Sequence, residues 1–176
     1  MTGARRRLTG ARVTLRAPLT TDVEALAAIQ AEPGVVRWWP PDTAEELHDM
    51  LFQPEADVVP WIIEHEGRVV GYVQDWEETD PLYRHAGIDL FLTTSAQGQG
   101  LGPDAIRTLA AHLIDDRGHH RLTIDPVATN ERAIRAYARV GFRPVGRLRA
   151  YQRTSDGGWE DGLLMEMLAD ELVRDA

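Results

Sequence analysis

A glycine-rich turn limits the fold of this chain more than any other feature. Residues 97–102 read Gln-Gly-Gln-Gly-Leu-Gly and separate a predicted strand, 86–92, from a predicted helix, about 101–116. Three glycines remove side chains, so backbone N–H groups can approach a ligand closely. The helix behind them adds unpaired N–H donors and the positive end of its dipole. The segment therefore predicts a strand-to-helix junction that can hold an anion such as a diphosphate.

This turn matches neither of the common nucleotide signatures. It lacks the Gly-Lys-Ser/Thr ending of a P-loop, and its spacing differs from the Gly-x-Gly-x-x-Gly dinucleotide pattern. Taken alone, the turn slightly favours the interpretation as a glycine-rich connector with no ligand.

Length and hydropathy set the domain organisation. The 176 residues suffice for one domain with a proper core. We expect a basic flexible arm at residues 1–10 and a single domain over 11–176. No apolar run approaches the roughly 20 residues of a membrane helix, and no apolar signal core follows the basic N-terminus. The sequence therefore predicts a cytoplasmic protein without a membrane partner, either a monomer or a homodimer.

Composition excludes several chemistries. The chain has no cysteine, and all 19 of its basic residues are arginine, so thiolate metal sites, acyl-cysteine intermediates and Schiff-base lysines are ruled out. The six histidines form no His-Glu-x-x-His motif, and we expect no metal. The net charge of −9 disfavours nucleic acid and favours a cationic substrate, although surplus acid also serves solubility alone.

The remaining pattern predicts an α/β domain with a mixed sheet. Capping boxes at 21–24 and 43–46 and an Asn130 cap predict three further helices, the last of which ends at Gly141. Residues 65–67 predict a hairpin turn, and 75–81 an acidic loop. Predicted strands cover residues 12–16, 58–64, 68–74, 86–92, 121–125, 143–152 and 163–168.

Two motifs in the expected order resemble the GNAT superfamily of N-acetyltransferases. The first is Gln/Arg-x-x-Gly-x-Gly/Ala, and the second links an asparagine, a tyrosine and a Gly-Phe pair. The resemblance covers residues 11–170 and implies a mostly antiparallel, mixed, twisted sheet of six to seven strands with about four helices. It also implies a splay between strands 4 and 5, where acetyl-CoA binds. The matching residues are Gln97, Gly100, Gly102, Asn130, Ala133, Tyr137, Gly141 and Phe142.

The resemblance also implies roles for individual residues. Tyr137 matches the family tyrosine that protonates the departing thiolate, and a phenol is protonated at neutral pH. Its alternative role is that of a core tyrosine on one helix face. The implied cofactor-binding residues are Phe91, Leu92, Gln97, Gly98, Gln99, Gly100, Leu101, Gly102, Asn130 and Tyr137.

Asp89 and Asp125 are the candidate bases. Asp89 alternates with Ile88 and Leu90, which places it on the opposite face of its strand. Asp125 ends the next strand, before Pro126. A carboxylate there can accept a proton from an amine, directly or through water, and can bind the ammonium form. Each is alternatively a structural acid that pairs with an arginine or caps a turn.

A closer resemblance is to the aminoglycoside 6′-N-acetyltransferases. It rests on Trp38-Trp39, 71–74, 76–81, 87–89 and 123–126, although the loop between 74 and 87 is shorter than in those enzymes. It implies a polycationic antibiotic as acceptor. An alternative is that the tryptophans are core residues and the acidic loop a solvated flap. The implied substrate-binding residues are Trp38, Gln74, Asp75, Trp76, Glu77, Glu78, Asp89 and Asp125.

Other functions fit parts of the pattern. Acetylation of a protein N-terminus, of a small polyamine or amino sugar, or of a siderophore or amino acid uses the same fold. A non-catalytic acyl-CoA sensor needs the turn at 97–102 but neither Asp89 nor Tyr137.

Overall fold

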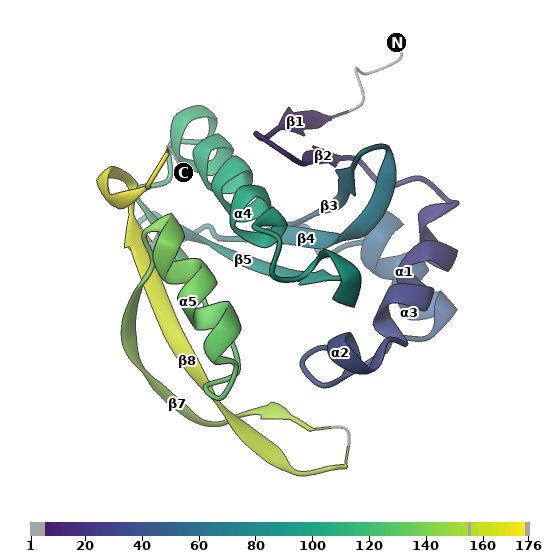
Figure 1. Cartoon of the computed structure of the whole chain (residues 1–176). Coiled ribbons are helices and arrows are strands. Elements are labelled where there is room, and N and C mark those ends of the chain that lie inside the picture. The colour runs from purple at the N-terminus through teal and green to yellow at the C-terminus, as the bar shows by residue number, and fades with distance from the viewer. Residues whose placement is uncertain (1–5, 155, 175–176) are drawn as a thin grey trace.

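The computed structural model describes residues 6–154 and 156–174 and contains one eight-stranded sheet in the order β1-β2-β3-β4-β5-β6-β8-β7 (Figure 1). Every neighbouring pair is antiparallel except β5 and β6. The strands are β1 (Arg7–Thr9), β2 (Thr14–Arg16), β3 (Val58–His65), β4 (Arg68–Glu78), β5 (His85–Leu92), β6 (Arg121–Ile124), β7 (Arg143–Arg153) and β8 (Trp159–Leu168). The helices are α1 (Asp22–Gln30), α2 (Pro33–Val36), α3 (Ala44–Phe52), α4 (Leu101–Ala111) and α5 (Glu131–Val140). A π-helical stretch, His112–Asp116, extends α4, and single 3₁₀ turns lie at Thr94–Ala96 and Ala169–Glu171.

The helices cover both faces of the sheet (Figure 1). On one face α4 and α5 pack on apolar residues such as Ile63, Val73 and Ile88. On the other face α1, α2 and α3 pack on Ile62 and Tyr72, the neighbours of the first set. This alternation follows from the two-residue period of a strand, and it makes the central strands apolar on both faces.

The hairpin between β3 and β4 confirms the predicted turn at 65–67. Glu66 and Gly67 both have positive φ, 50° and 75°, which suits a two-residue loop between twisted strands. The acidic loop predicted at 75–81 is wrong in its first half, because β4 continues to Glu78 and pairs there with His85. Cross-strand pairing with β5 thus outweighs the weak strand propensity of the acidic residues.

The predicted helix starts have different outcomes. Thr43 and Glu46 form the predicted capping box, with Thr43 N–H donating to the Glu46 carboxylate at 2.7 Å. The capping box at Thr21 is wrong, since its side chain makes no capping hydrogen bond. The buried Asp22 carboxylate instead accepts the N–H of Leu19, before the helix, at 2.7 Å and pairs with Arg16 at 2.6 Å. The stop predicted at 32–34 is confirmed, because α1 ends at Gln30, and the short helix α2 then begins at Pro33, a favoured first position.

The N-terminal arm is shorter than predicted. β1 lies inside the expected flexible segment 1–10 and pairs with β2, and Arg6 Nη2 donates to the Pro60 carbonyl at 2.6 Å. The open edge of β2 offers the hydrogen bonds that order this segment, and β1 raises the strand count above the predicted six to seven. Residues 1–5 lie outside the described residues.

The sheet divides where β5 meets β6, as predicted. Among the described residues, β5 and β6 are joined by two residue pairs, Ala86 with Leu122 and Gly87 with Thr123. Beyond these pairs the two parallel strands separate, so Asp89 and Asp125 lie on either side of the opening. In the described part of the chain, no helix has the length and apolarity needed to cross a membrane.

Candidate active site

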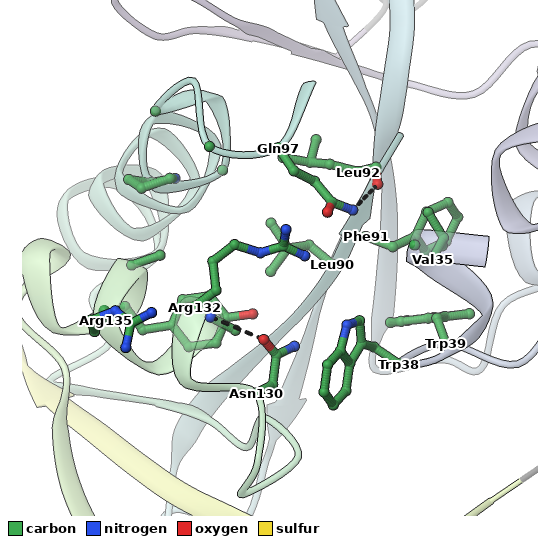
Figure 2. A pocket seen from close by; sticks show the side chains of 18 of the residues that line it. Val35, Trp38, Trp39, Leu90, Phe91, Leu92, Gln97, Asn130, Arg132 and Arg135 are labelled. Carbon is green, nitrogen blue, oxygen red and sulfur yellow. Dashed lines mark hydrogen bonds between the residues drawn. The ribbon is translucent and has the colours of Figure 1, made fainter. Parts of the chain in front are cut away.

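A groove of about 410 Å³ runs between the end of β5, the glycine-rich turn and α5 (Figure 2). Eight of the ten predicted cofactor-binding residues line it. Gln99 does not, since its side chain turns back to the Ser95 carbonyl at 2.6 Å, and Leu101 is buried in the core. The residues that line the groove as predicted are Phe91, Leu92, Gln97, Gly98, Gly100, Gly102, Asn130 and Tyr137.

The turn has the backbone shape that its glycines predict. Gly98 and Gly100 adopt φ of 76° and 81°, a left-handed conformation that costs other residues free energy. Gly100 is the N-cap of α4, so the first amide groups of that helix open toward the groove. Gln97 Nε2 donates to the Leu92 carbonyl at 2.9 Å, while its buried Oε1 has no partner among the described residues. These features fit a ligand that carries both a diphosphate and amide donors, as acetyl-CoA does.

Three arginines on α5 complete the groove. Arg132, Arg135 and Arg139 line it, and Figure 2 shows Arg132 extending from the helix into the groove. Guanidinium groups are well suited to phosphate oxygens. Sequence reasoning missed these residues, although their spacing of three and four places them on one face of a helix that begins at Asn130. Asn130 caps that helix, as predicted, by accepting the Ala133 N–H at 3.2 Å.

A smaller pocket of about 120 Å³ adjoins the groove at the split between β5 and β6. It contains both predicted acids, Asp89 from β5 and Asp125 from the end of β6. The groove and this acceptor pocket share five lining residues, so the two spaces meet. The shared residues are Trp38, Trp39, Leu90, Asn130 and Tyr137.

Asp89 has the environment of a base. Gln74 Nε2 donates to its carboxylate at 3.2 Å, and the Tyr72 hydroxyl holds Gln74 Oε1 at 2.8 Å. Burial, followed by the negative charge of Asp125, raises the pKa of Asp89 to about 6, against the opposing hydrogen bonds of Gln74 and Trp76. A carboxylate with this pKa is ionised at neutral pH and accepts a proton more readily than an exposed one.

Asp125 has a different partner. The Tyr151 hydroxyl, from β7, donates to its Oδ2 at 2.5 Å. Burial raises the pKa of Asp125, and the Tyr151 hydrogen bond acts in the opposite direction. Tyr151 also lines the acceptor pocket and was not identified from the sequence, because the pattern of β7 gives no sign of which residue reaches across to β6.

Tyr137 lies where the groove and the acceptor pocket meet. Burial raises the pKa of its phenol, and the carboxylates of Asp89 and Asp125 raise it further. The group is therefore protonated at neutral pH and can donate a proton. Its ring also packs against the core of the sheet, so the alternative structural role describes part of its environment.

The two predicted tryptophans have separate environments. Trp39 packs on Tyr72 and Phe91, with centroids at 6.4 and 5.0 Å, and so belongs in part to the core. Trp38 is half-buried in the wall of both spaces, and the Arg37 guanidinium lies 4.3 Å from its ring.

The acidic end of β4 divides between the two faces of the sheet. Gln74, Trp76 and Glu78 alternate onto the face of Asp89. Trp76 covers Gly87 so closely that a Cβ there would lie 2.0 Å from its ring, and it reaches Asp89. Neither Trp76 nor Glu78 lines the groove or the acceptor pocket, and Glu78 accepts the Asp80 N–H at 2.9 Å.

Asp75 and Glu77 were predicted to bind substrate, and the structure contradicts this. Asp75 is fully buried on the α4 face, where it accepts hydrogen bonds from Trp61 Nε1 at 2.8 Å and Arg117 Nη1 at 2.6 Å. Glu77 pairs with the same arginine at 2.5 Å and with Arg84 at 3.1 Å. Because β4 is a strand here and not a loop, every second acid points away from the acceptor pocket.

The described residues hold no group of three or more histidines and acids that is arranged to bind a metal ion. A groove for a diphosphate-bearing carrier that meets a carboxylate-lined pocket at a protonated tyrosine defines an acyltransferase of the acyl-CoA-using class. A family model described as an acetyltransferase (GNAT) domain matches residues 12–143. The chain therefore belongs to the GNAT acetyltransferase family and is an enzyme that uses acetyl-CoA.

Known relatives agree with this assignment. Aminoglycoside N(6')-acetyltransferase type 1 of Klebsiella pneumoniae is 33% identical over 153 residues, which cover 76% of this chain and 75% of that protein. The aminoglycoside acetyltransferase AAC(6')-Ib, solved with coenzyme A and kanamycin, is 30% identical with a TM-score of 0.76, covering 93% of this chain and 99% of that one. Mycobacterium smegmatis RimJ, solved with CoA-disulfide, is 25% identical with a TM-score of 0.81, covering 97% and 91%.

Proposed function

We propose that this enzyme transfers the acetyl group of acetyl-CoA to the 6′-amine of an aminoglycoside, by direct attack of the amine in a ternary complex. The observation that carries the proposal is the pair Asp89 and Asp125, which face one pocket at the end of the cofactor groove. Two carboxylates in a half-buried pocket attract an ammonium group, and the net charge of −9 attracts a polycation. The similarity to aminoglycoside 6′-N-acetyltransferases supports the choice of acceptor.

The residues of the pocket divide the chemistry among them. Asp89 accepts the proton of the attacking amine, directly or through one water, and its raised pKa of about 6 suits that role. Bound acetyl-CoA supplies the thioester carbonyl that the amine attacks. Backbone N–H groups near Phe91 and Leu92, which line the groove, would hold its carbonyl oxygen. Tyr137 donates a proton to the leaving sulfur.

The size of the acceptor pocket limits what enters it. Its volume of about 120 Å³ admits an aminomethyl end and not a whole aminosugar antibiotic. The rest of the acceptor then lies outside the pocket, near Trp38 in its wall. Glu78 lies on the same face of β4 as Gln74 but adds little, because Asp89 and Asp125 are the acids that line the pocket among the described residues.

A substrate panel tests this proposal. Release of free thiol from acetyl-CoA is measured with kanamycin and tobramycin, and in parallel with spermidine and a peptide that has a free N-terminus. We expect turnover with the two antibiotics and modification of the 6′-amine, identified by NMR of the product. No antibiotic-dependent release, together with turnover of the peptide or polyamine, would contradict the choice of acceptor.

The similarity to RimJ makes acetylation of a protein N-terminus the second candidate function. The peptide arm of the same panel decides between the two. Multiple turnovers with any acceptor exclude a non-catalytic acyl-CoA sensor.

A further inference from the structure

Tyr151 joins the β7–β8 hairpin to the acceptor pocket. Its hydroxyl donates to Asp125 Oδ2 at 2.5 Å, and its side chain is half exposed.

 Tyr151 is 49% exposed. The hydroxyl is therefore held by its hydrogen bond and by the backbone of the hairpin, and not by burial of the ring.

The backbone beside Tyr151 is built to aim it inward. The register of β7 against β8 shifts between Leu148 and Gln152, and within that shift Ala150 has a positive φ of 48°. Its N–H donates to Asp161 Oδ1 at 2.7 Å, and Arg147 Nε holds the other oxygen of Asp161 at 2.5 Å. A bulge of this kind redirects one side chain out of the regular alternation.

The opposite strand leaves room for the ring. At Gly162 on β8, an added Cβ would lie 2.8 Å from Tyr151 Cδ1. A side chain there would displace the ring and move the hydroxyl away from Asp125. The bulge and this glycine thus place one hydroxyl on one carboxylate oxygen.

We propose that Tyr151 is a positioning residue that keeps Asp125 as the ionised anchor for the acceptor's ammonium group and so leaves Asp89 to accept the proton. This inference rests on the proposed function. The titratable groups that face Asp125 are Asp89 from β5, Tyr137 from α5 and Tyr151 from β7. Of these, Tyr151 has a hydrogen bond to Asp125, and a bond to the charged form favours ionisation.

Unequal environments give two neighbouring carboxylates different roles. Burial raises the pKa of both acids, but the Tyr151 hydroxyl counteracts the shift at Asp125. The charge that remains on Asp125 then helps to raise the pKa of Asp89. Loss of the hydroxyl removes this asymmetry.

Steady-state kinetics of Tyr151→Phe test the inference. We expect the KM for the aminoglycoside to rise about 10-fold near pH 6.5 and to approach the wild-type value by pH 8.5. We expect kcat to change less than about 3-fold. Tyr83→Phe is the matched control, since Tyr83 is 70% exposed in the β4–β5 loop, and it should leave both constants unchanged. An equal loss of activity at every pH, with a lower Tm, would assign Tyr151 a structural role instead.

Two further measurements on Tyr151→Phe test the inference in other ways. In an Asp125→Asn background, Tyr151→Phe should have no additional effect, and an additive effect overturns the inference. Carboxyl ¹³C NMR titration of the free protein should show the pKa of Asp125 raised by Tyr151→Phe. An unchanged pKa overturns the positioning role even if aminoglycosides prove not to be substrates, whereas failure of the substrate panel alone contradicts only the proposed function.

Discussion

At the residue scale, Asp89 combines a cost in stability with a role in the proposed chemistry. Burial and the charge of Asp125 raise its pKa to about 6, so its ionised form is disfavoured in the folded protein. A buried carboxylate whose pKa is shifted in this way is a candidate for a functional residue.

We expect Asp89→Asn to lower kcat/KM for the acceptor about 10²–10⁴-fold, because it removes the base. Acetyl-CoA affinity should be unchanged, and the free energy of unfolding at pH 8 should rise by about 1–2 kcal/mol, since a buried charge is lost. Kinetics, calorimetric titration and denaturant unfolding measure the three quantities. Asp80→Asn, in the exposed loop after β4, is the control, and unchanged turnover in Asp89→Asn would remove this residue from the mechanism.

Tyr137 has a ring that packs against the core and a hydroxyl at the junction of groove and pocket. We expect Tyr137→Phe to lower kcat about 10–100-fold while the Tm changes by less than about 3 °C, because the ring packing is retained. Turnover and thermal melts are measured on the same preparation. A large fall in Tm with little loss of kcat would favour the structural role.

At the scale of elements, α5 contributes to both sides of the site. Its cap, Asn130, lines the groove and the acceptor pocket, its Tyr137 lies where they meet, and its arginines face the groove. One helix therefore fixes the cofactor relative to the acceptor, so small shifts of α5 should affect both.

The arginine face of α5 predicts a phosphate contact. We expect Arg132→Gln to raise the KM for acetyl-CoA about 5–20-fold with kcat retained, and to weaken the dependence of that KM on ionic strength. Arg174→Gln is the control, because Arg174 pairs with Asp115 outside the groove. Equal effects of both substitutions would mean that only overall charge matters.

At the scale of the whole molecule, stability and activity should respond to pH in opposite directions. Asp89 and Asp125 have a raised pKa in the folded state, so the folded protein binds their protons more tightly than the unfolded chain. The contribution of Asp89 is complete below its unfolded pKa of about 4 and is lost as the pH rises through about 6, and that of Asp125 is lost as the pH rises through its own raised pKa.

We therefore expect the Tm to be about 2–6 °C higher at pH 5.5 than at pH 8, while kcat/KM falls below pH 6 as Asp89 becomes protonated. Thermal melts and kinetics over pH 5–8.5 measure both trends. Asp89→Asn should flatten the pH dependence of the Tm, and an unchanged dependence would show that another group controls it.

The sequence predicted the site best where local backbone geometry makes the site. The turn at 97–102 has positive φ at Gly98 and Gly100 because only glycine adopts it without cost, and Asn130 caps its helix through a local hydrogen bond. Prediction was weakest where partners are distant, as for Asp75, whose carboxylate binds Trp61 and Arg117. No local pattern shows which face of β4 an acid occupies until the strand is known to extend to Glu78.

The sequence by itself determined the GNAT fold and the glycine-rich turn, because these depend on short-range geometry and on motifs in a fixed order, and it named Asp89 and Asp125 as candidate bases. The tertiary structure decided which residues face the acceptor. Pairing with β5 turned Asp75 and Glu77 toward Arg117, and the bulge in β7 brought Tyr151 to Asp125. These contacts join segments 26 to 42 residues apart, and their geometry is set only when the sheet has formed.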